Sequence, residues 1–391
     1  MPLSNEDSLR LNVLLAQKVS AIRIDEGKLI VYALTQKGVA KIQLSPTARN
    51  DKYIKEVKDF LSTRALGTPG GFPMYISRWN RMGDLRNNNL NKLLLLGEEE
   101  AVIAVVNNRK LTAGLARSAW WVVQSADNAR SMLANEKVLQ ADIGHELATF
   151  LIEFLPYEED PLKMLISTRL VLQPGLISND EIMILWKKAK SKNTLYVGFL
   201  EIRPDELPEQ ASEHASYQQT RDRLSDLLAA KNPYAIALCK LLSAPGQTFL
   251  QTAEVAFKRP ADYDVVGALI ESIRRYVFVD HPEAGQSKQE YQLGLNLKGE
   301  IQTDINDVVA LANDIYHEQN ELFCSEELKA IQTAVPELSA QLKAILSLAR
   351  TPQTVLAPTI AKSTAVGTLM RKKLKPVFEP ILMNLKVLQT F

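Results

Sequence analysis

The sequence contains few of the residues that build disulfide frameworks and metal clusters. Among its 391 residues are only two cysteines, Cys239 and Cys324, and four histidines. Two cysteines so far apart exclude a disulfide framework, so a reducing cytoplasm is the simplest compartment. His145 and Glu146 are adjacent, but the second histidine of a zinc-protease helix does not follow. We therefore predict neither a metal site nor a cofactor.

A strong net charge and long apolar runs are also absent. Lysine and arginine number 46 and aspartate and glutamate 45, so no overall field steers the chain to nucleic acid or anionic lipid. The four leucines at 93–96 fall far short of the roughly 20 apolar residues that a membrane span needs. Residues 1–17 lack the basic leader of a signal peptide and have the pattern of a capped amphipathic helix. We expect a soluble, cytoplasmic protein without a membrane span.

The loops of common enzyme classes are missing as well. No Gly-x-Ser-x-Gly elbow occurs, and the glycine-rich stretch at 64–83, RALGTPGGFPMYISRWNRMG, lacks the Lys-Ser/Thr pair of a phosphate-binding loop. Its prolines remove backbone donors that such a loop needs. The stretch has the pattern of a turn after a helix that ends near Leu66. We predict no catalytic residue and no small-molecule substrate, and we expect the protein not to be an enzyme.

The residues just beyond these glycines form a candidate partner-binding segment. Tyr75, Arg78, Trp79 and Arg81 combine aromatic and cationic side chains, which could stack on or pair with another molecule. Packing of the arginines against Trp79 within the fold is the alternative.

The first 66 residues have the pattern of a small α+β unit. Short alternating segments at 19–24, 28–34 and 38–44 are separated by hairpin turns, which predicts a three-stranded antiparallel sheet. Apolar residues between Tyr53 and Leu61 then recur with the helical period, so a helix is expected to cover the sheet.

From Leu90 onward the apolar period is helical. Acidic helix starts recur with steps of 28 and 33 residues, counted from Ala101 to Ala129 and from Ala129 to Leu162. This spacing is typical of stacked helix pairs, as in an α-solenoid, and an irregular helical array is the alternative. The fold class predicted for the whole chain is mainly α, with the small N-terminal α+β unit.

Composition shifts divide the remainder of the chain. We predict a glycine-rich connection at 67–89, a helical repeat-like domain at 90–205 and a C-terminal helical domain at 216–391 with a basic end. The polar segment 203–219, with two prolines, is the candidate linker between the last two.

The C-terminus carries the clearest charge asymmetry. Residues 351–391 contain six lysines and arginines but one acidic residue, Glu379. A candidate basic patch comprises Arg371, Lys372, Lys373 and Lys375, which could bind RNA or an acidic surface. A terminal helix that buries its apolar face and leaves its lysines in solvent is the alternative.

Cys324 offers a third kind of chemistry, that of a sulfur carrier. It precedes a helical pattern that Ser325 could cap, and the dipole at a helix N-terminus favours a thiolate. Neighbouring Glu321, Glu326 and Glu327 oppose that ionisation. Cys239, within AIALCKLL, has the pattern of a packed helix face instead.

Several strings of the first 200 residues resemble a known family. LGTPGGFPMYISRWNRMG, LLLLGEEEAVIAVV, LARSAWW, ADNARSML, FLPYEEDP, RLVLQPGLIS and LYVGFL are similar to the DsrS-type sulfur reduction family. Its members are encoded with the dissimilatory sulfite reductase genes of sulfur-oxidising bacteria. The similarity is dense from about residue 8 to 210 and thinner afterwards. It implies a cytoplasmic accessory protein of Dsr-linked sulfur metabolism, and it transfers no enzymatic activity and no functional residues.

The function expected from these observations is that of a non-catalytic helical scaffold. It would bind another macromolecule, with a protein of the sulfur-oxidation system as the expected partner. An RNA-binding regulator that uses the basic C-terminal helix is the second hypothesis, and a sulfur carrier that uses Cys324 is the third.

Overall fold

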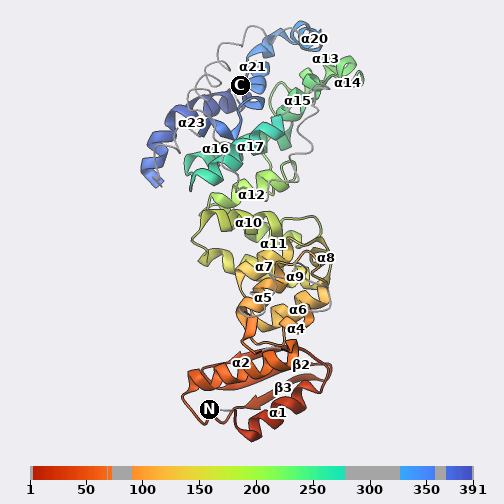
Figure 1. Cartoon of the computed structure of the whole chain (residues 1–391). Coiled ribbons are helices and arrows are strands. Elements are labelled where there is room, and N and C mark those ends of the chain that lie inside the picture. Colours follow the sequence, from red (N-terminus) through yellow and green to blue (C-terminus); the bar gives the residue numbers. More distant parts are fainter. Residues whose placement is uncertain (1–2, 68, 73–89, 278–325, 357–366, 390–391) are drawn as a thin grey trace. The chain divides into compact units, whose positions relative to one another are not determined.

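The computed structural model describes residues 3–67, 69–72, 90–277, 326–356 and 367–389, and of residues 367–371 only the backbone (Figure 1). Within these residues 68% are helical, in 19 α-helices, and the strands form one three-stranded antiparallel sheet near the N-terminus. The predicted fold class, mainly α with a small N-terminal α+β unit, is confirmed.

The N-terminal elements follow one another in the order helix, three strands, helix. They are α1 (Asn5–Leu15), β1 (Val19–Asp25), β2 (Ile30–Thr35), β3 (Gly38–Gln43) and α2 (Asn50–Leu66). The strands pair in the order β1-β2-β3, as the hairpin turns predict. The apolar stripe predicted for the covering helix is buried, because Tyr53, Ile54, Val57 and Leu61 pack against Ile22, Val31 and Ala33 of the sheet.

A buried carboxylate fixes α1 against α2. Asp7 is fully buried, and its Oδ2 accepts hydrogen bonds from the Tyr53 hydroxyl at 2.5 Å and from the Ser45 N–H at 2.9 Å. The Ser4 hydroxyl caps α1 by accepting from the Asp7 N–H. Both helices pack on the same face of the sheet, because Leu11 and Leu14 of α1 belong to the same core as the buried stripe of α2.

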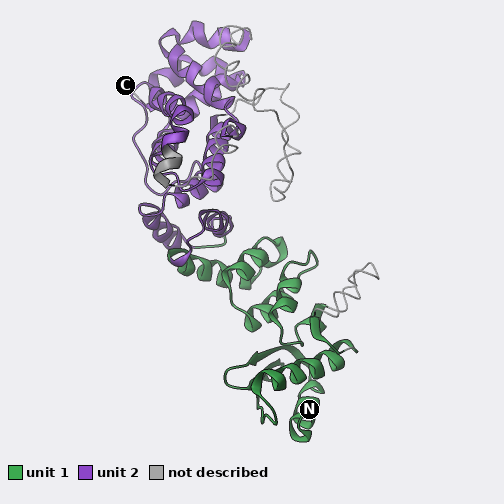
Figure 2. Cartoon of the chain, turned by 60° about the vertical axis from the view of Figure 1, so that its left-hand side comes forward, with its two compact units in different colours: residues 1–156, 174–177 green, residues 157–173, 178–391 purple. Residues whose placement is uncertain are grey.

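The chain divides into two compact units, coloured separately in Figure 2. Unit 1 comprises residues 1–156 and 174–177, and unit 2 comprises residues 157–173 and 178–391. Beyond the N-terminal elements, the helices of unit 1 are α4 (Leu90–Leu93), α5 (Glu99–Val106), α6 (Ala113–Val122), α7 (Ala126–Leu133), α8 (Glu136–Leu139) and α9 (Asp142–Phe154). The sequence-based domain boundaries stay a prediction.

Unit 2 is an irregular array of helices. Its helices are α10 (Pro161–Val171), α11 (Asn179–Ala189), α12 (Thr194–Ile202), α13 (Tyr217–Arg223), α14 (Ser225–Ala229), α15 (Pro233–Leu242), α16 (Ala244–Lys258), α17 (Tyr263–Val277), α20 (Glu326–Ala334), α21 (Ser339–Ala349) and α23 (Gly367–Gln389). α23 packs on α16, and α20 packs on α15, far apart in sequence. A solenoid would restrict contacts to neighbouring repeats, so within the described residues this unit is not one.

The candidate linker at 203–219 contains little regular structure, because α12 ends at Ile202 and α13 begins at Tyr217. It nevertheless packs on unit 2. The His214 N–H donates to the Leu242 carbonyl at 2.9 Å, and the Ala211 N–H donates to Thr248 Oγ1 at 2.9 Å. None of the helices in the described parts of the chain is long and apolar enough to cross a membrane.

A close contact between two helices of unit 2 involves Gly198. An ideal Cβ on this residue of α12 would lie 2.5 Å from Cγ2 of Thr168 on α10. Thr168 is fully buried, and its hydroxyl donates to the Met164 carbonyl at 2.8 Å. Its side chain therefore has little room to move away.

We expect Gly198→Ala to lower the free energy of unfolding by about 1–3 kcal/mol, because overpacking pushes α10 and α12 apart. Gly114→Ala is the matched control, since nothing lies within 4 Å of a Cβ on Gly114 in α6; it should be neutral or stabilise by about 0.5 kcal/mol. Urea unfolding followed by circular dichroism measures both. Thr168→Ser should recover part of the loss in Gly198→Ala, and equal stability of the two alanine variants would contradict the close approach.

Candidate functional site

The partner-binding segment predicted from the sequence lies outside the described residues. Tyr75, Arg78, Trp79 and Arg81 fall within 73–89, and Cys324 falls within 278–325. Their proposed roles stay predictions.

The start of the glycine-rich stretch is a helix cap. Gly67 has a φ of +75°, and its N–H bonds to the Thr63 carbonyl at 2.9 Å. This left-handed conformation is the usual end of an α-helix and is open to glycine. The turn predicted after Leu66 is confirmed.

Three backbone N–H groups further along the stretch donate to side chains of the same chain. Gly70 donates to Asp59 at 3.0 Å, Gly71 donates to Ser62 at 3.2 Å, and Phe72 donates to Glu98 at 2.7 Å. Two of the three acceptors are carboxylates. The N–H groups of the turn therefore already bind carboxylates of the chain itself. Burial raises the pKa of Glu98, although the Phe72 N–H and the charge of Lys58 oppose that effect.

The basic patch predicted near the C-terminus lies on α23. Lys372, Lys373 and Lys375 are exposed, and Lys375 pairs with Glu379 at 3.3 Å. Arg371 belongs to the same helix, but the structure describes only its backbone. The three lysines thus occupy the solvent side of a helix whose apolar residues Leu374 and Phe378 are buried.

Cys239 occupies the packed position that its sequence pattern predicts. It lies on α15 with 8% of its surface exposed. Burial raises the pKa of its thiol, an effect that the charge of Arg221 opposes. A neutral thiol in this place is a small apolar side chain.

A surface pocket lies between α6 and α9 in unit 1. Its volume is about 470 Å³. We call it the α6–α9 pocket, and it is lined chiefly by Trp120, Asp142, His145, Glu146, Phe150 and Glu153.

Aromatic side chains form the floor of the α6–α9 pocket. The rings of Trp120 and Phe150 meet edge to face with centroids 4.8 Å apart, and Phe150 stacks on Phe154. Trp120 is only 3% exposed, and its indole N–H donates to Glu146 Oε1 at 2.8 Å. This bond ties Trp120 of α6 to a carboxylate on α9.

Acidic side chains surround this floor. Asp142, Glu146 and Glu153 recur at i, i+4 and i+11, which places them on one face of α9. The lining residues include no lysine or arginine, although Arg117 lies 3.9 Å from Asp142. His145 also lines the pocket, and its Nδ1 lies 3.0 Å from the Leu176 carbonyl oxygen. The α6–α9 pocket therefore attracts cations.

No sequence motif pointed to this site. The spacing of the acidic residues along α9 was a usable signal for an acidic helix face. That Trp120 packs beside this face depends on how α6 and α9 meet, and no local pattern encodes that contact.

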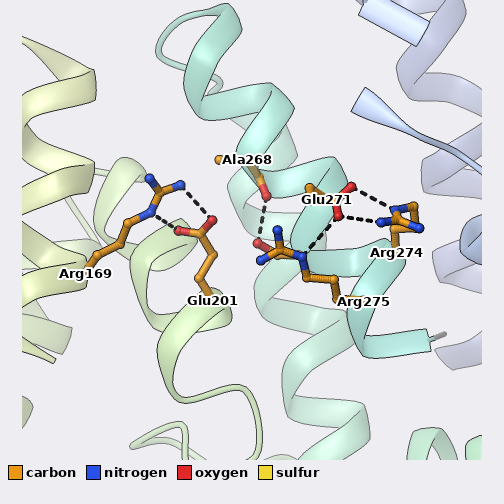
Figure 3. Close-up of polar contacts among 7 residues, drawn as sticks. Arg169, Glu201, Ala268, Glu271, Arg274 and Arg275 are labelled. Atoms are coloured by element: carbon orange, nitrogen blue, oxygen red, sulfur yellow. Dashed lines mark hydrogen bonds and ion pairs between the residues drawn. The ribbon is translucent and has the colours of Figure 1, made fainter. Parts of the chain in front are cut away.

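A second cluster of charges connects helices of unit 2 (Figure 3). Arg169 of α10 donates two hydrogen bonds to Glu201 of α12, one of them at 2.7 Å. On α17, Glu271 accepts from Arg274 at 2.7 and 2.8 Å and from Arg275 at 3.1 Å. Each carboxylate is thus engaged by arginines of the chain itself. The Arg169–Glu201 pair joins α10 to α12, and the bonds of Glu271 stay within α17.

Comparison with family models, curated proteins and solved structures finds no match for this chain. The part of the chain that the structure describes also contains no group of three or more histidine, cysteine or acidic side chains arranged to hold a metal ion. The α6–α9 pocket must therefore be interpreted from its own chemistry.

The charges on α17 predict a pH-dependent stability. Burial disfavours the charged form of Glu271, but the hydrogen bonds and charge of Arg274, together with the charge of Arg275, outweigh burial and hold the pKa of Glu271 below its ordinary value. A lowered pKa in the folded state stabilises the protein at a pH above the unfolded pKa, and this contribution is lost as the pH falls through the folded pKa.

We expect Glu271→Gln to lower the free energy of unfolding by about 1–2 kcal/mol at neutral pH, since the group is partly exposed. The difference from the wild type should shrink between about pH 5 and pH 3. Urea unfolding at a series of pH values measures it, with Glu379→Gln on the exposed face of α23 as the control. A deficit that is independent of pH would contradict the role of the ionised Glu271.

Proposed function

We propose that this protein is a non-catalytic helical scaffold that binds a basic segment of a partner protein in the α6–α9 pocket. The observation that carries the proposal is the combination of an aromatic floor with three carboxylates on one helix face. Such a site suits lysine and arginine side chains, which pair with carboxylates through their charged heads and pack along aromatic rings with their stems.

The expected affinity for a basic segment can be estimated from its ion pairs and its cation–aromatic contacts. Exposed ion pairs contribute about 0.2–1 kcal/mol each, and a cation over an aromatic ring contributes about 0.5–2 kcal/mol. Three carboxylates and the partly exposed ring of Phe150 therefore support weak to moderate affinity that decreases with added salt, because the Trp120 ring is buried. Charges at the rim act mainly on the association rate and on the choice of partner.

The cellular role in this proposal is that of a cytoplasmic accessory protein that supports or regulates Dsr-linked sulfur metabolism. The support is the similarity of strings such as ADNARSML and FLPYEEDP to the DsrS-type family. ADNARSML is the whole of α7, which lies between α6 and α9 in sequence, and FLPYEEDP connects α9 to α10. The basic segment would then belong to a protein of the sulfur-oxidation system.

A peptide titration tests the binding chemistry. A peptide that alternates arginine with leucine should bind the full chain, and a glutamate–leucine peptide of equal length should not. The double charge reversal Asp142→Lys/Glu153→Lys should weaken binding of the basic peptide about tenfold or more, because two attractions become repulsions. Fluorescence anisotropy at low and high salt measures the affinity.

Asp222→Lys, on the exposed face of α13, is the control for a change in overall charge. Glu146→Gln keeps an acceptor for the Trp120 indole while it removes a charge, and it should give an intermediate loss. If the basic peptide binds the double variant as well as it binds Asp222→Lys, the α6–α9 pocket is not its site.

A cross-linking experiment tests the partner in cells. A photoreactive residue in place of Gln124, an exposed residue that lines the pocket, should cross-link to peptides rich in lysine and arginine. The same residue in place of Asp222 gives the background. Cross-links to acidic peptides, or none above background during growth on reduced sulfur, would contradict the proposed role.

A further inference from the structure

We propose that the N-terminal elements α1 to α2 form a second binding surface, one that takes the backbone of double-stranded RNA. This surface is separate from the α6–α9 pocket and does not depend on the function proposed for that pocket. The proposal rests on the topology of these elements, on the pairing of their charges and on the way one turn is held beside α2.

The topology places two helices on one face of a small sheet. α1 and α2 share a core with the strands through Leu11, Val57 and Ile22, so their outer sides face away from the sheet (Figure 1). Recognition of duplex RNA by its shape uses contacts to phosphates and 2′-hydroxyls across neighbouring grooves, with little sequence readout, so it needs charges on a rigid frame.

The first 66 residues are more basic than the chain as a whole. They contain eleven lysines and arginines against seven acidic residues, a surplus of four, whereas the full chain has a net charge of +1. A local surplus of this kind attracts a polyanion even where the overall charge is balanced.

The exposed carboxylates of this region are mostly neutralised locally. Four of them pair with a nearby cation: Glu6 with Arg10, Asp25 with Lys28, Glu26 with Lys58, and Asp51 with Arg49. Asp7 is buried and accepts hydrogen bonds from Tyr53 and Ser45. After these pairs have formed, residues 1–66 still contain more cationic than anionic side chains.

The excess cations include two lysines on the outer side of α2. Lys52 and Lys55 are exposed, and within the described residues neither has a carboxylate within ion-pair distance. They lie three residues apart in the first two turns, so their side chains are neighbours on the helix surface. That end of a helix also carries partial positive charge, which adds to the attraction for phosphate.

The turn between β1 and β2 is held beside these lysines. Lys58, one turn beyond Lys55 on α2, bonds to Glu26 in the turn at 2.7 Å. Gln43 of β3 donates to the Lys28 and Leu29 carbonyls at 3.0 and 3.2 Å, which fixes the turn from its other side. The side chain of Lys28 is 73% exposed. We call Lys28, Lys52 and Lys55 the α2 lysine surface. Lys28 also lies 3.6 Å from Asp25, so Lys52 and Lys55 contribute most of its unpaired charge.

Duplex RNA fits the α2 lysine surface better than single strands. Recognition of single strands relies on aromatic platforms for the bases, and the aromatic residues of this region are engaged elsewhere. Tyr53 is buried, and Tyr32 lies under the guanidinium of Arg23 at 5.2 Å. Phosphates along a duplex need only positive charge at fixed spacing, which two helical turns and a fixed hairpin supply.

An electrophoretic or anisotropy titration with an RNA duplex of about 20 base pairs tests the proposal. The full chain should bind it at low salt, and the slope of log affinity against log salt should correspond to about three phosphate contacts. Lys52→Glu/Lys55→Glu should weaken binding at least about tenfold and make the salt slope shallower. Circular dichroism should show that this variant remains folded, because both side chains are exposed.

Lys37→Glu/Lys41→Glu is the matched control, since it makes the same change in net charge on β3 and the turn before it. It should leave the duplex affinity within about twofold. Lys372→Glu/Lys373→Glu on α23 tests the basic C-terminal helix in the same way. If that variant loses binding while Lys52→Glu/Lys55→Glu keeps it, the RNA site lies on α23 and the proposal is overturned.

Two further results would also overturn it. One is tighter binding of single-stranded RNA or of a DNA duplex of the same sequence. The other is no retention of the RNA duplex by the wild-type chain at low salt. The pocket variant Asp142→Lys/Glu153→Lys should bind the duplex like the wild type, so a failure of this inference is distinguishable from a failure of the proposed function.

Discussion

Tertiary packing has to stabilise almost every helix in this chain, because most of the helices are too short to form alone. Isolated helices below about 12–15 residues are marginal in water, and α5, α6 and α7 have 8, 10 and 8 residues. Hydroxyl caps such as Thr112 on α6 and Ser125 on α7 fix where these helices begin. Burial of their apolar sides against neighbouring helices is what makes them form.

The α6–α9 pocket and the lysines of α2 also depend on helix packing. The α6–α9 pocket exists because Trp120 is buried from one side while Phe150 and Glu146 meet it from the other. In the N-terminal elements, the hydrogen bonds of Tyr53 and Ser45 to Asp7 join α1, α2 and the segment after β3. Loosening either core would displace the charged side chains on the opposite faces of the same helices.

Charge segregation explains why a nearly neutral chain can offer two surfaces of opposite sign. The acidic face of α9 and the lysines of α2 both lie on the sides that their helices leave in solvent, where ionised groups cost nothing to hydrate. The acidic face of α9 is the surface proposed for a basic protein segment, and the lysines of α2 form the surface proposed for an RNA duplex. The total charge of +1 conceals both.

The local patterns of the sequence determined the secondary structure of the N-terminal elements and the turn that follows them. Alternation and hairpin turns located the three strands, the helical stripe from Tyr53 to Leu61 located α2, and Gly67 ended it, since each signal lies within a few residues of the structure that it specifies. Only the tertiary structure decided the pairs that build the sites. Trp120 and Glu146 are 26 residues apart, and Arg169 and Glu201 are 32 apart. Contacts between separate helices depend on how their buried faces fit together, which a periodic pattern of apolar residues does not specify.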